Sequence, residues 1–172
     1  MRTMPGIPRV RKVHAGILGV FVILAASIFL APLSLPSNSV SDLSGKVGEI
    51  DNEEAMNEMN PFAHIVYFVG DWNCHQLSER SFFLNGNEMP VCARDTGVIL
   101  GLSLGMLLAL LVPLRIGWLF LILGMVPLMV DGFAQLILNY ESDNVIRLLT
   151  GGVAGVVLSI FLAGIVERAM SL

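Results

Sequence analysis

Four long apolar stretches divide the chain into membrane-spanning and non-spanning parts. They run from Ala15 to Leu35, from Thr96 to Leu114, from Ile116 to Leu138 and from Val145 to Val166. Each approaches the roughly 20 residues that an α-helix needs to cross about 30 Å of hydrocarbon. The pattern predicts an all-α fold, with a four-helix transmembrane bundle at residues 15–35, 96–114, 116–138 and 145–166.

The first stretch allows two interpretations, because basic residues precede it as they precede a signal peptide: Arg2, Arg9, Arg11 and Lys12. Its apolar core is longer than the roughly 7 to 15 residues of a signal peptide, which favours a retained anchor. The same four cations, with Arg115 in the turn between the second and third stretches and Arg168 after the fourth, predict the orientation. We expect residues 1–14 and the C-terminus in the cytoplasm, residues 36–95 outside it, and the protein in the plasma membrane.

The long connection between the first two spans divides into residues 36–60 and 61–95. The first part is rich in Ser, Asn, Asp and Glu, as in a solvated acidic linker. Asn60 and Pro61 then match a helix N-cap and a first-turn proline, and apolar residues follow at helical spacing: Phe62, Ile65, Val66 and Val69. This helix, from Pro61 to about His75, is too short to span. We expect an extra interfacial amphipathic helix on the outer side.

Small residues recur at every fourth position in the second and fourth spans: Gly97, Gly101, Gly105 and Ala109, then Gly151, Gly155, Ser159 and Ala163. Such stripes let helix backbones approach closely in lipid. We expect these two spans to pack against each other, although either stripe could serve a homo-oligomer.

Composition supports the membrane assignment and excludes one class of partner. Hydrophobic residues make up 55% of the chain and charged residues 14%, and the mean hydropathy is +0.75. The net charge of -4 comes from the outward segments, and no basic footprint of a nucleic-acid binder is present. The expected partners are the lipid bilayer and either a homo-oligomer or a membrane complex, with no nucleic acid.

Ionisable residues gather at the predicted outer ends of the spans. Asp131 and Gln135 lie on one face of the third span, about 22 Å along the helix at 1.5 Å per residue. A carboxylate at that depth is costly and is a candidate for function. Arg94 and Arg147 are its expected counter-ions. The cluster could only fix helix register, or it could join Arg80 in holding an anion, because guanidinium groups match phosphate and carboxylate.

Both cysteines lie on the outward side, with seventeen residues between Cys74 and Cys92. An oxidising compartment favours a disulfide between them. A thiolate metal site completed by His75, Asp71 or Asp95 is the alternative. The spacing matches neither a zinc finger nor a haem-attachment motif, so no cofactor is identified beyond a metal ion as a candidate.

The sequence contains candidate catalytic residues but does not decide whether the protein is an enzyme. A cysteine or Ser81 beside His75 or Glu79 could supply a nucleophile and a base. No G-x-S-x-G, H-E-x-x-H or P-loop spacing accompanies them.

Three segments resemble signatures of one family: CHQLSERSFFLNGNEMPVCARDTGVILG (Cys74 to Gly101), DGFAQ (Asp131 to Gln135) and NVIRLLTGG (Asn144 to Gly152). The chain resembles the domain of unknown function 2085 family, small multipass membrane proteins that are mostly archaeal and bacterial, over about residues 61–165. That family often has Cys where this chain has Asp95, so a shared three-cysteine metal site is not implied. The positions that the resemblance marks are Cys74, His75, Gln76, Arg80, Ser81, Pro90, Cys92, Arg94, Thr96, Gly97, Asp131, Gly132, Gln135, Asn144, Arg147, Thr150 and Gly151.

Together these patterns predict a polar pocket in the outer leaflet that binds a small anionic or metal-bearing ligand. An accessory or structural membrane subunit with a Cys74/Cys92 disulfide is one alternative, and a membrane enzyme acting on a lipid or thiol is another. The metal ligands would be Cys74, His75 and Cys92. The residues expected to line the pocket are Cys74, His75, Gln76, Arg80, Ser81, Cys92, Arg94, Asp95, Thr96, Asp131, Gln135, Asn144, Arg147 and Thr150.

Overall fold

The structure is a computed structural model that describes residues 7–138 and 141–171. Arg2, one of the cations used for orientation, lies outside the described residues. The helices are α1 (Ile7–Leu33), α2 (Glu53–Asn57), α3 (Pro61–Asn73), α4 (Ala93–Leu111), α5 (Trp118–Leu138) and α6 (Asn144–Met170). A 3-10 helix, η1 (Ser78–Arg80), leads into an antiparallel hairpin of β1 (Ser81–Leu84) and β2 (Asn87–Cys92).

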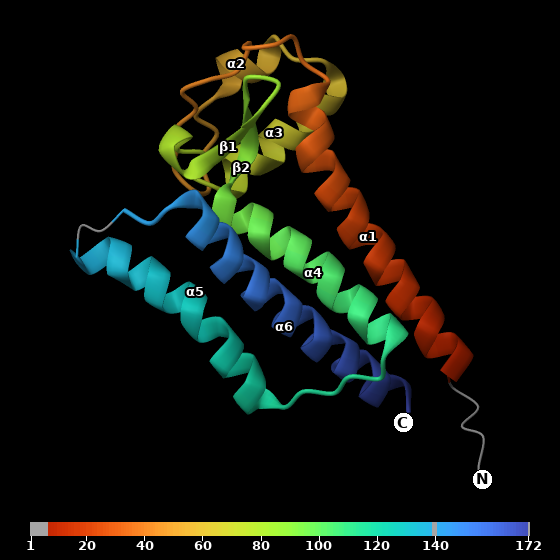
Figure 1. Cartoon of the computed structure of the whole chain (residues 1–172). Helices are drawn as coiled ribbons and strands as arrows, with labels where there is room; N and C mark the ends of the chain where they lie inside the picture. The colour runs from red at the N-terminus through yellow and green to blue at the C-terminus, as the bar shows by residue number, and fades with distance from the viewer. Residues whose placement is uncertain (1–6, 139–140, 172) are drawn as a thin grey trace.

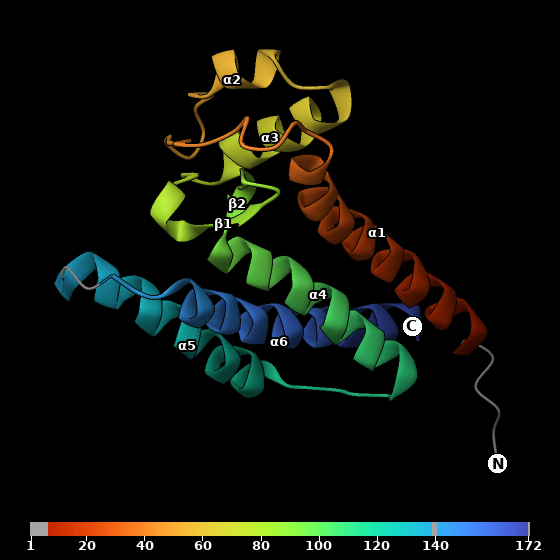
Figure 2. The ribbon, with the colours of Figure 1, turned by 45° about the horizontal axis from the view of Figure 1, so that its top comes forward.

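Four helices, α1, α4, α5 and α6, are long and apolar enough to cross a membrane, which confirms that the chain has four helices of this kind. They stand in a row in which α1 lies beside α4, α4 beside α6, and α6 beside α5 (Figures 1 and 2). The start of α1, the turn between α4 and α5, and the C-terminus lie at one end of the row. Residues 34–92 form a cap at the other end, and the hairpin in this cap was not predicted.

The tightest packing in the row joins α4 to α6. A Cβ atom added to Gly101 would overlap the carbonyl oxygen of Gly152, and one added to Gly155 would overlap that of Val98. The two small-residue stripes therefore pack against each other, as predicted, and bring the two backbones into contact. α5 packs against α6 and leaves most of its apolar surface exposed.

Residues 36–60 differ from the expected solvated linker, because they pack into the cap. Val40, Leu43 and Met56 are buried in a cluster that also contains Ala31 at the end of α1 and Tyr67 of α3. The acidic composition of this segment conceals these few apolar positions, which lie too far apart in the chain to form a helical or strand pattern. The segment is therefore part of the folded cap.

Buried polar side chains hold this irregular segment in place. Asn87 Oδ1 accepts hydrogen bonds from the backbone N–H groups of Ser39 and Val40, at 2.8 and 3.0 Å. Glu88 Oε2 accepts from the N–H of Leu43 at 3.1 Å, and burial raises the pKa of Glu88. Loop backbone that is buried needs such partners, because it has no helix or sheet to satisfy it.

A second carboxylate, Asp71 of α3, does the same for the following turn. Its Oδ2 atom accepts from the backbone N–H groups of Asp51 and Asn52, at 2.9 and 3.0 Å. Tyr67, one turn earlier, donates its hydroxyl to the Glu88 carbonyl at 2.5 Å, and burial raises the pKa of this phenol. The polar face of α3 is thus turned into the cap.

The opposite face of α3 is apolar and exposed. It carries Phe62, Ile65, Phe68, Val69 and Trp72, each more than 40% exposed. The helix ends at Asn73, and Cys74 already has an extended backbone, with φ of -135°. The predicted helix therefore extended too far, and His75 lies beyond the end of α3.

The hairpin between Leu84 and Asn87 turns at Asn85 and Gly86, whose φ angles of 56° and 73° match a type I′ turn. Asparagine followed by glycine is the strongest short hairpin signal in a sequence, and it was present here. A side chain on Gly86 would also overlap the side chain of Asn38. The turn thereby fixes the hairpin against the cap segment that follows α1.

Replacing Gly101 with alanine tests the close packing of α4 and α6. Because the added Cβ meets backbone atoms of α6, which cannot rotate away, we expect the free energy of unfolding to fall by about 1–3 kcal/mol. Gly16→Ala in α1 is the control, since nothing lies within 4 Å of the added atom. Denaturant titration in detergent measures both variants. Equal stability of the two would contradict the described interface.

Candidate functional site

A charged network lies where α4, α5 and α6 meet the cap. Arg94, in the first turn of α4, forms an ion pair with Asp131 of α5, with 2.5 Å between Nη2 and Oδ2. Gln135, one turn further along α5, donates its amide to the same oxygen at 3.1 Å. The Asp131 side chain is only 6% exposed, so the ion pair links α5 to α4 in a largely buried position.

Arg147 connects this network to the cap. It is 3% exposed, and its Nη1 atom donates to Asn144 Oδ1 at 2.9 Å and to the Glu79 carbonyl at 3.4 Å. Its Nη2 atom lies 3.4 Å from Gln135 Oε1. Asn144 in turn donates to the carbonyl of Ser81 at 3.2 Å. The first turn of α6 is therefore bonded to η1, β1 and α5.

Positive charge exceeds negative charge at this point. Arg80, Arg94 and Arg147 form what we call the arginine cluster, in which Arg147 lies within electrostatic range of the other two. Asp131 is the carboxylate that forms an ion pair with it in the described part of the chain. The Nε atom of each of the three arginines is buried and has no hydrogen-bond partner among the described residues. Guanidinium N–H groups in such positions are donors that an added oxyanion could satisfy.

Arg80 is the freest member of the cluster. Its side chain makes no hydrogen bond or ion pair with any described residue, and it is half-buried. It is the last residue of η1 and directly precedes β1, and it lies within electrostatic range of Arg147 of α6. The Arg80 side chain is thus available to a ligand without loss of a contact that holds the fold.

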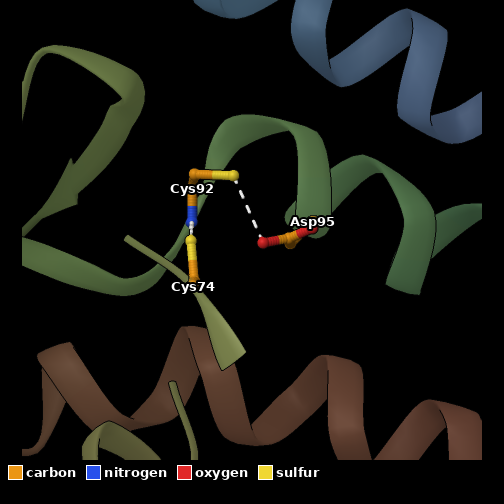
Figure 3. Close-up of side chains that lie close together, drawn as sticks. All are labelled: Cys74, Cys92 and Asp95. Atoms are coloured by element: carbon orange, nitrogen blue, oxygen red, sulfur yellow. Dashed lines mark hydrogen bonds between the residues drawn. The ribbon is translucent and has the colours of Figure 1, made fainter. Parts of the chain in front are cut away.

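The two cysteines form a second cluster with Asp95, which Figure 3 shows. The backbone N–H of Cys92 points at Cys74 Sγ at 3.3 Å, and Cys92 Sγ lies 3.3 Å from Asp95 Oδ2. The two sulfurs and a carboxylate oxygen all lie within 4.8 Å of one another. Both cysteines are free thiols in the structure, and the disulfide between them stays a prediction.

The thiols of the pair differ in their environments. Cys74 is buried, and a side-chain hydrogen bond between its thiol and that of Cys92, together with this burial, raises its pKa. The same hydrogen bond lowers the pKa of Cys92, which sits at the N-cap of α4. Cys92 is therefore the thiol that ionises first.

The other residues of the predicted pocket have separate roles. His75 is exposed, with Nδ1 at 3.1 Å from the Gly45 carbonyl, and it is not in the group of Cys74, Cys92 and Asp95. Gln76 is buried in the cap and donates to the Pro90 carbonyl at 2.7 Å. The hydroxyls of Thr96 and Thr150 bond carbonyls at the start of their own helices, and that of Ser81 bonds Leu77.

A hollow of about 540 Å³ lies elsewhere, along α5. Its lining is apolar and belongs to a single helix: Val126, Met129, Val130, Phe133, Ala134, Ile137 and Leu138. A surface of this kind suits lipid chains, and it contains none of the charged residues described above.

Comparisons with known proteins agree with these features. The model of a family described as Predicted membrane protein (DUF2085) matches residues 74–161. The matched range includes the arginine cluster and the cluster of Cys74, Cys92 and Asp95, and it leaves out α1 and most of the cap. An uncharacterized protein of Methanocaldococcus jannaschii is 34% identical over 152 residues, covering 84% of this chain and 86% of that protein. An uncharacterized protein of Methanothermobacter thermautotrophicus is 39% identical over 90 residues, covering 51% and 81% respectively. No solved structure matches.

A double-mutant cycle tests the ion pair between Arg94 and Asp131. We expect Arg94→Gln and Asp131→Asn each to destabilise the protein, and the double variant to lose less than the sum, with a coupling of about 1–3 kcal/mol. The pair of Arg115 and Glu167, 2.8 Å apart, is the control; because the Arg115 side chain is 69% exposed, this pair should couple by less than about 1 kcal/mol. Denaturant titration in detergent gives all the values. Additive losses at Arg94 and Asp131 would refute a coupled pair.

Proposed function

Since the chain belongs to the domain of unknown function 2085 family of predicted membrane proteins, we propose that it is a plasma-membrane protein that binds a small oxyanion at the arginine cluster. One observation carries the proposal: three arginines of one cluster each have a buried Nε atom without a hydrogen-bond partner among the described residues, and Asp131 is the one carboxylate that forms an ion pair with them there. Phosphate and carboxylate groups are the anions that guanidinium donors match best.

Hydrogen bonding supports the same ligand class. Leaving charged donors buried and unpartnered costs free energy, whereas each hydrogen bond from a charged donor contributes about 1.5–3 kcal/mol. An oxyanion would supply acceptors to several guanidinium groups together. A structural subunit that used the network only to fix helix register would need Arg94 and Asp131 but would gain nothing from Arg80. The unpaired Arg80 therefore favours binding over a purely structural role.

The proposed orientation places both termini in the cytoplasm and the cap, with the arginine cluster beneath it, on the outer side. Arg9, Arg11 and Lys12 at the start of α1, Arg115 in the turn after α4, and Arg168 near the end of α6 support it, because they lie at the end of the row away from the cap. Cytoplasmic ends of spanning helices carry an excess of such cations.

We place α3 at the outer membrane interface. Its exposed apolar face would otherwise meet water, and a helix with one apolar face and one hydrogen-bonded polar face is suited to the boundary between headgroups and acyl chains. Trp72, on the apolar face, has the amphipathic ring that favours this depth. The cap would then be anchored to the bilayer through α3 as well as through α1 and α4.

Arg80→Gln tests the anion site while leaving the hydrogen bonds of the fold intact. Isothermal titration calorimetry in detergent with inorganic phosphate should show binding to the wild type and at least about tenfold weaker binding to the variant, since one charged hydrogen bond is lost. Arg115→Gln, which removes an arginine at the far end of the row, should bind as the wild type does.

The source of the anion is distinguished by a second probe. Native mass spectrometry from nanodiscs that contain phosphatidic acid would retain the lipid on the wild type and not on Arg80→Gln if the group belongs to a lipid headgroup. Binding of phosphate without lipid retention would indicate a soluble anion. If neither probe binds, or if Arg80→Gln and Arg115→Gln behave alike, the proposed site is wrong.

The interfacial position of α3 is tested by the fluorescence of Trp72. Trp118→Phe leaves Trp72 as the one tryptophan in the chain, which contains two. In vesicles of lipids brominated on their acyl chains, we expect its emission to be quenched relative to unbrominated vesicles. Ile65→Asp in the same background should weaken the quenching, because it places a charge on the apolar face. Emission that bromination leaves unchanged would place α3 away from the bilayer.

A further inference from the structure

We propose that Cys74, Cys92 and Asp95 bind a divalent metal ion, for which zinc is the best match. The three residues come from separate elements: Cys74 follows α3, Cys92 ends β2, and Asp95 lies in the first turn of α4 (Figure 3). Their sulfur and oxygen atoms nevertheless converge within 4.8 Å of one another. This site is separate from the arginine cluster, and its existence does not depend on anion binding there.

The spacing of the ligand atoms fits a tetrahedral ion with little movement. Zinc lies about 2.3 Å from thiolate sulfur and about 2.0–2.2 Å from carboxylate oxygen, so two of its ligands stand roughly 3.3–3.8 Å apart. Cys92 Sγ and Asp95 Oδ2 are already 3.3 Å apart. An ion bound between them would replace the thiol proton that joins them now.

The donor set selects among metals. Magnesium and calcium prefer oxygen ligands, so a site with two sulfur ligands does not suit either ion. Thiolates combined with a carboxylate suit zinc, which accepts sulfur, nitrogen and oxygen donors. Cys74, Cys92 and Asp95 supply three ligands, which leaves a fourth position for water or another small ligand, as in zinc sites that stay open.

The surroundings hold the ligands in place independently of any metal. The backbone N–H of Cys92 is directed at Cys74 Sγ, and an N–H donor of this kind stabilises a thiolate ligand. Gln76, with a φ of 45°, turns the chain after Cys74 and bonds the Pro90 carbonyl of β2. These two contacts join the Cys74 segment to the strand that carries Cys92.

Charge compensation comes from the neighbouring arginines. Two thiolates, a carboxylate and a divalent ion together leave one net negative charge, which would be costly to bury alone. Arg147 lies within electrostatic range of Cys92 and provides an opposite charge. Of the three residues expected to complete the ligand set, Asp95 lies with the two cysteines, whereas His75 does not.

The experiment uses the full-length protein purified in detergent with a phosphine reductant, so that both thiols are available. Zinc titration followed by elemental analysis should give one ion per chain. Cobalt(II) in its place should produce a thiolate-to-metal charge-transfer band and intense tetrahedral visible absorption. Cys92→Ser should abolish both signals, and Asp95→Asn should weaken zinc binding at least about tenfold. His75→Ala is the matched control and should bind as the wild type does.

Several results would overturn the proposal. One is a protein that takes up no stoichiometric zinc although alkylation and mass measurement of a separate sample show that both of its thiols are reduced. Another is His75→Ala losing as much zinc as Asp95→Asn. Should Cys92→Ser fail to fold, as thermal unfolding would reveal, Asp95→Asn decides alone. Phosphate binding by Asp95→Asn is also measured by calorimetry. If its affinity for phosphate equals that of the wild type, the loss of zinc binding is distinguished from a loss of the anion site.

Discussion

The close contact between α4 and α6 determines where every functional candidate lies. A side chain on Gly97 would overlap the Leu148 carbonyl, and one on Gly151 would overlap that of Arg94 itself. This backbone contact continues to the end of the helices at which Arg94 and Arg147 stand. Because α4 begins directly after β2, the same contact sets how far the thiols lie from the arginines. Wider residues in either stripe would separate the helices and with them the two clusters.

The cap also depends on β2, the strand that directly precedes α4. Asn87 and Glu88 of β2 satisfy the backbone of the segment that follows α1, while Cys92, at the end of the strand, supplies a thiol. The polar side chains that fold the cap and the residues of the candidate metal site thus share one short element. A buried network of this kind tolerates little rearrangement, since each unsatisfied group would cost free energy. Rigid support of the thiols follows directly from it.

The sequence predicted those features of the fold that depend on the periodic spacing of apolar or small residues. Four apolar stretches gave four helices, and regular small residues predicted the partner of each stripe. The pairing of Asp131 with Arg94 followed from their expected depth. The fold of residues 36–60 did not follow, because it rests on hydrogen bonds to residues more than 40 positions away. His75 was misplaced for a simpler reason: α3 ends at Asn73, and a short extension of the helix changes the direction of every later side chain.

The balance of charge links the two clusters. Alone, the arginine cluster has more positive charge than Asp131 can neutralise, and a metal held by two thiolates and Asp95 would carry one negative charge in excess. Each imbalance would be costly in a partly buried position, but together they offset each other, because Cys92 and Arg147 lie within electrostatic range of each other. The two proposed sites, which form independently of each other, would then balance each other's charge. Such mutual compensation explains why the chain keeps ionisable and sulfur-bearing side chains together at the junction of three spanning helices and the cap, where an apolar core would be more stable.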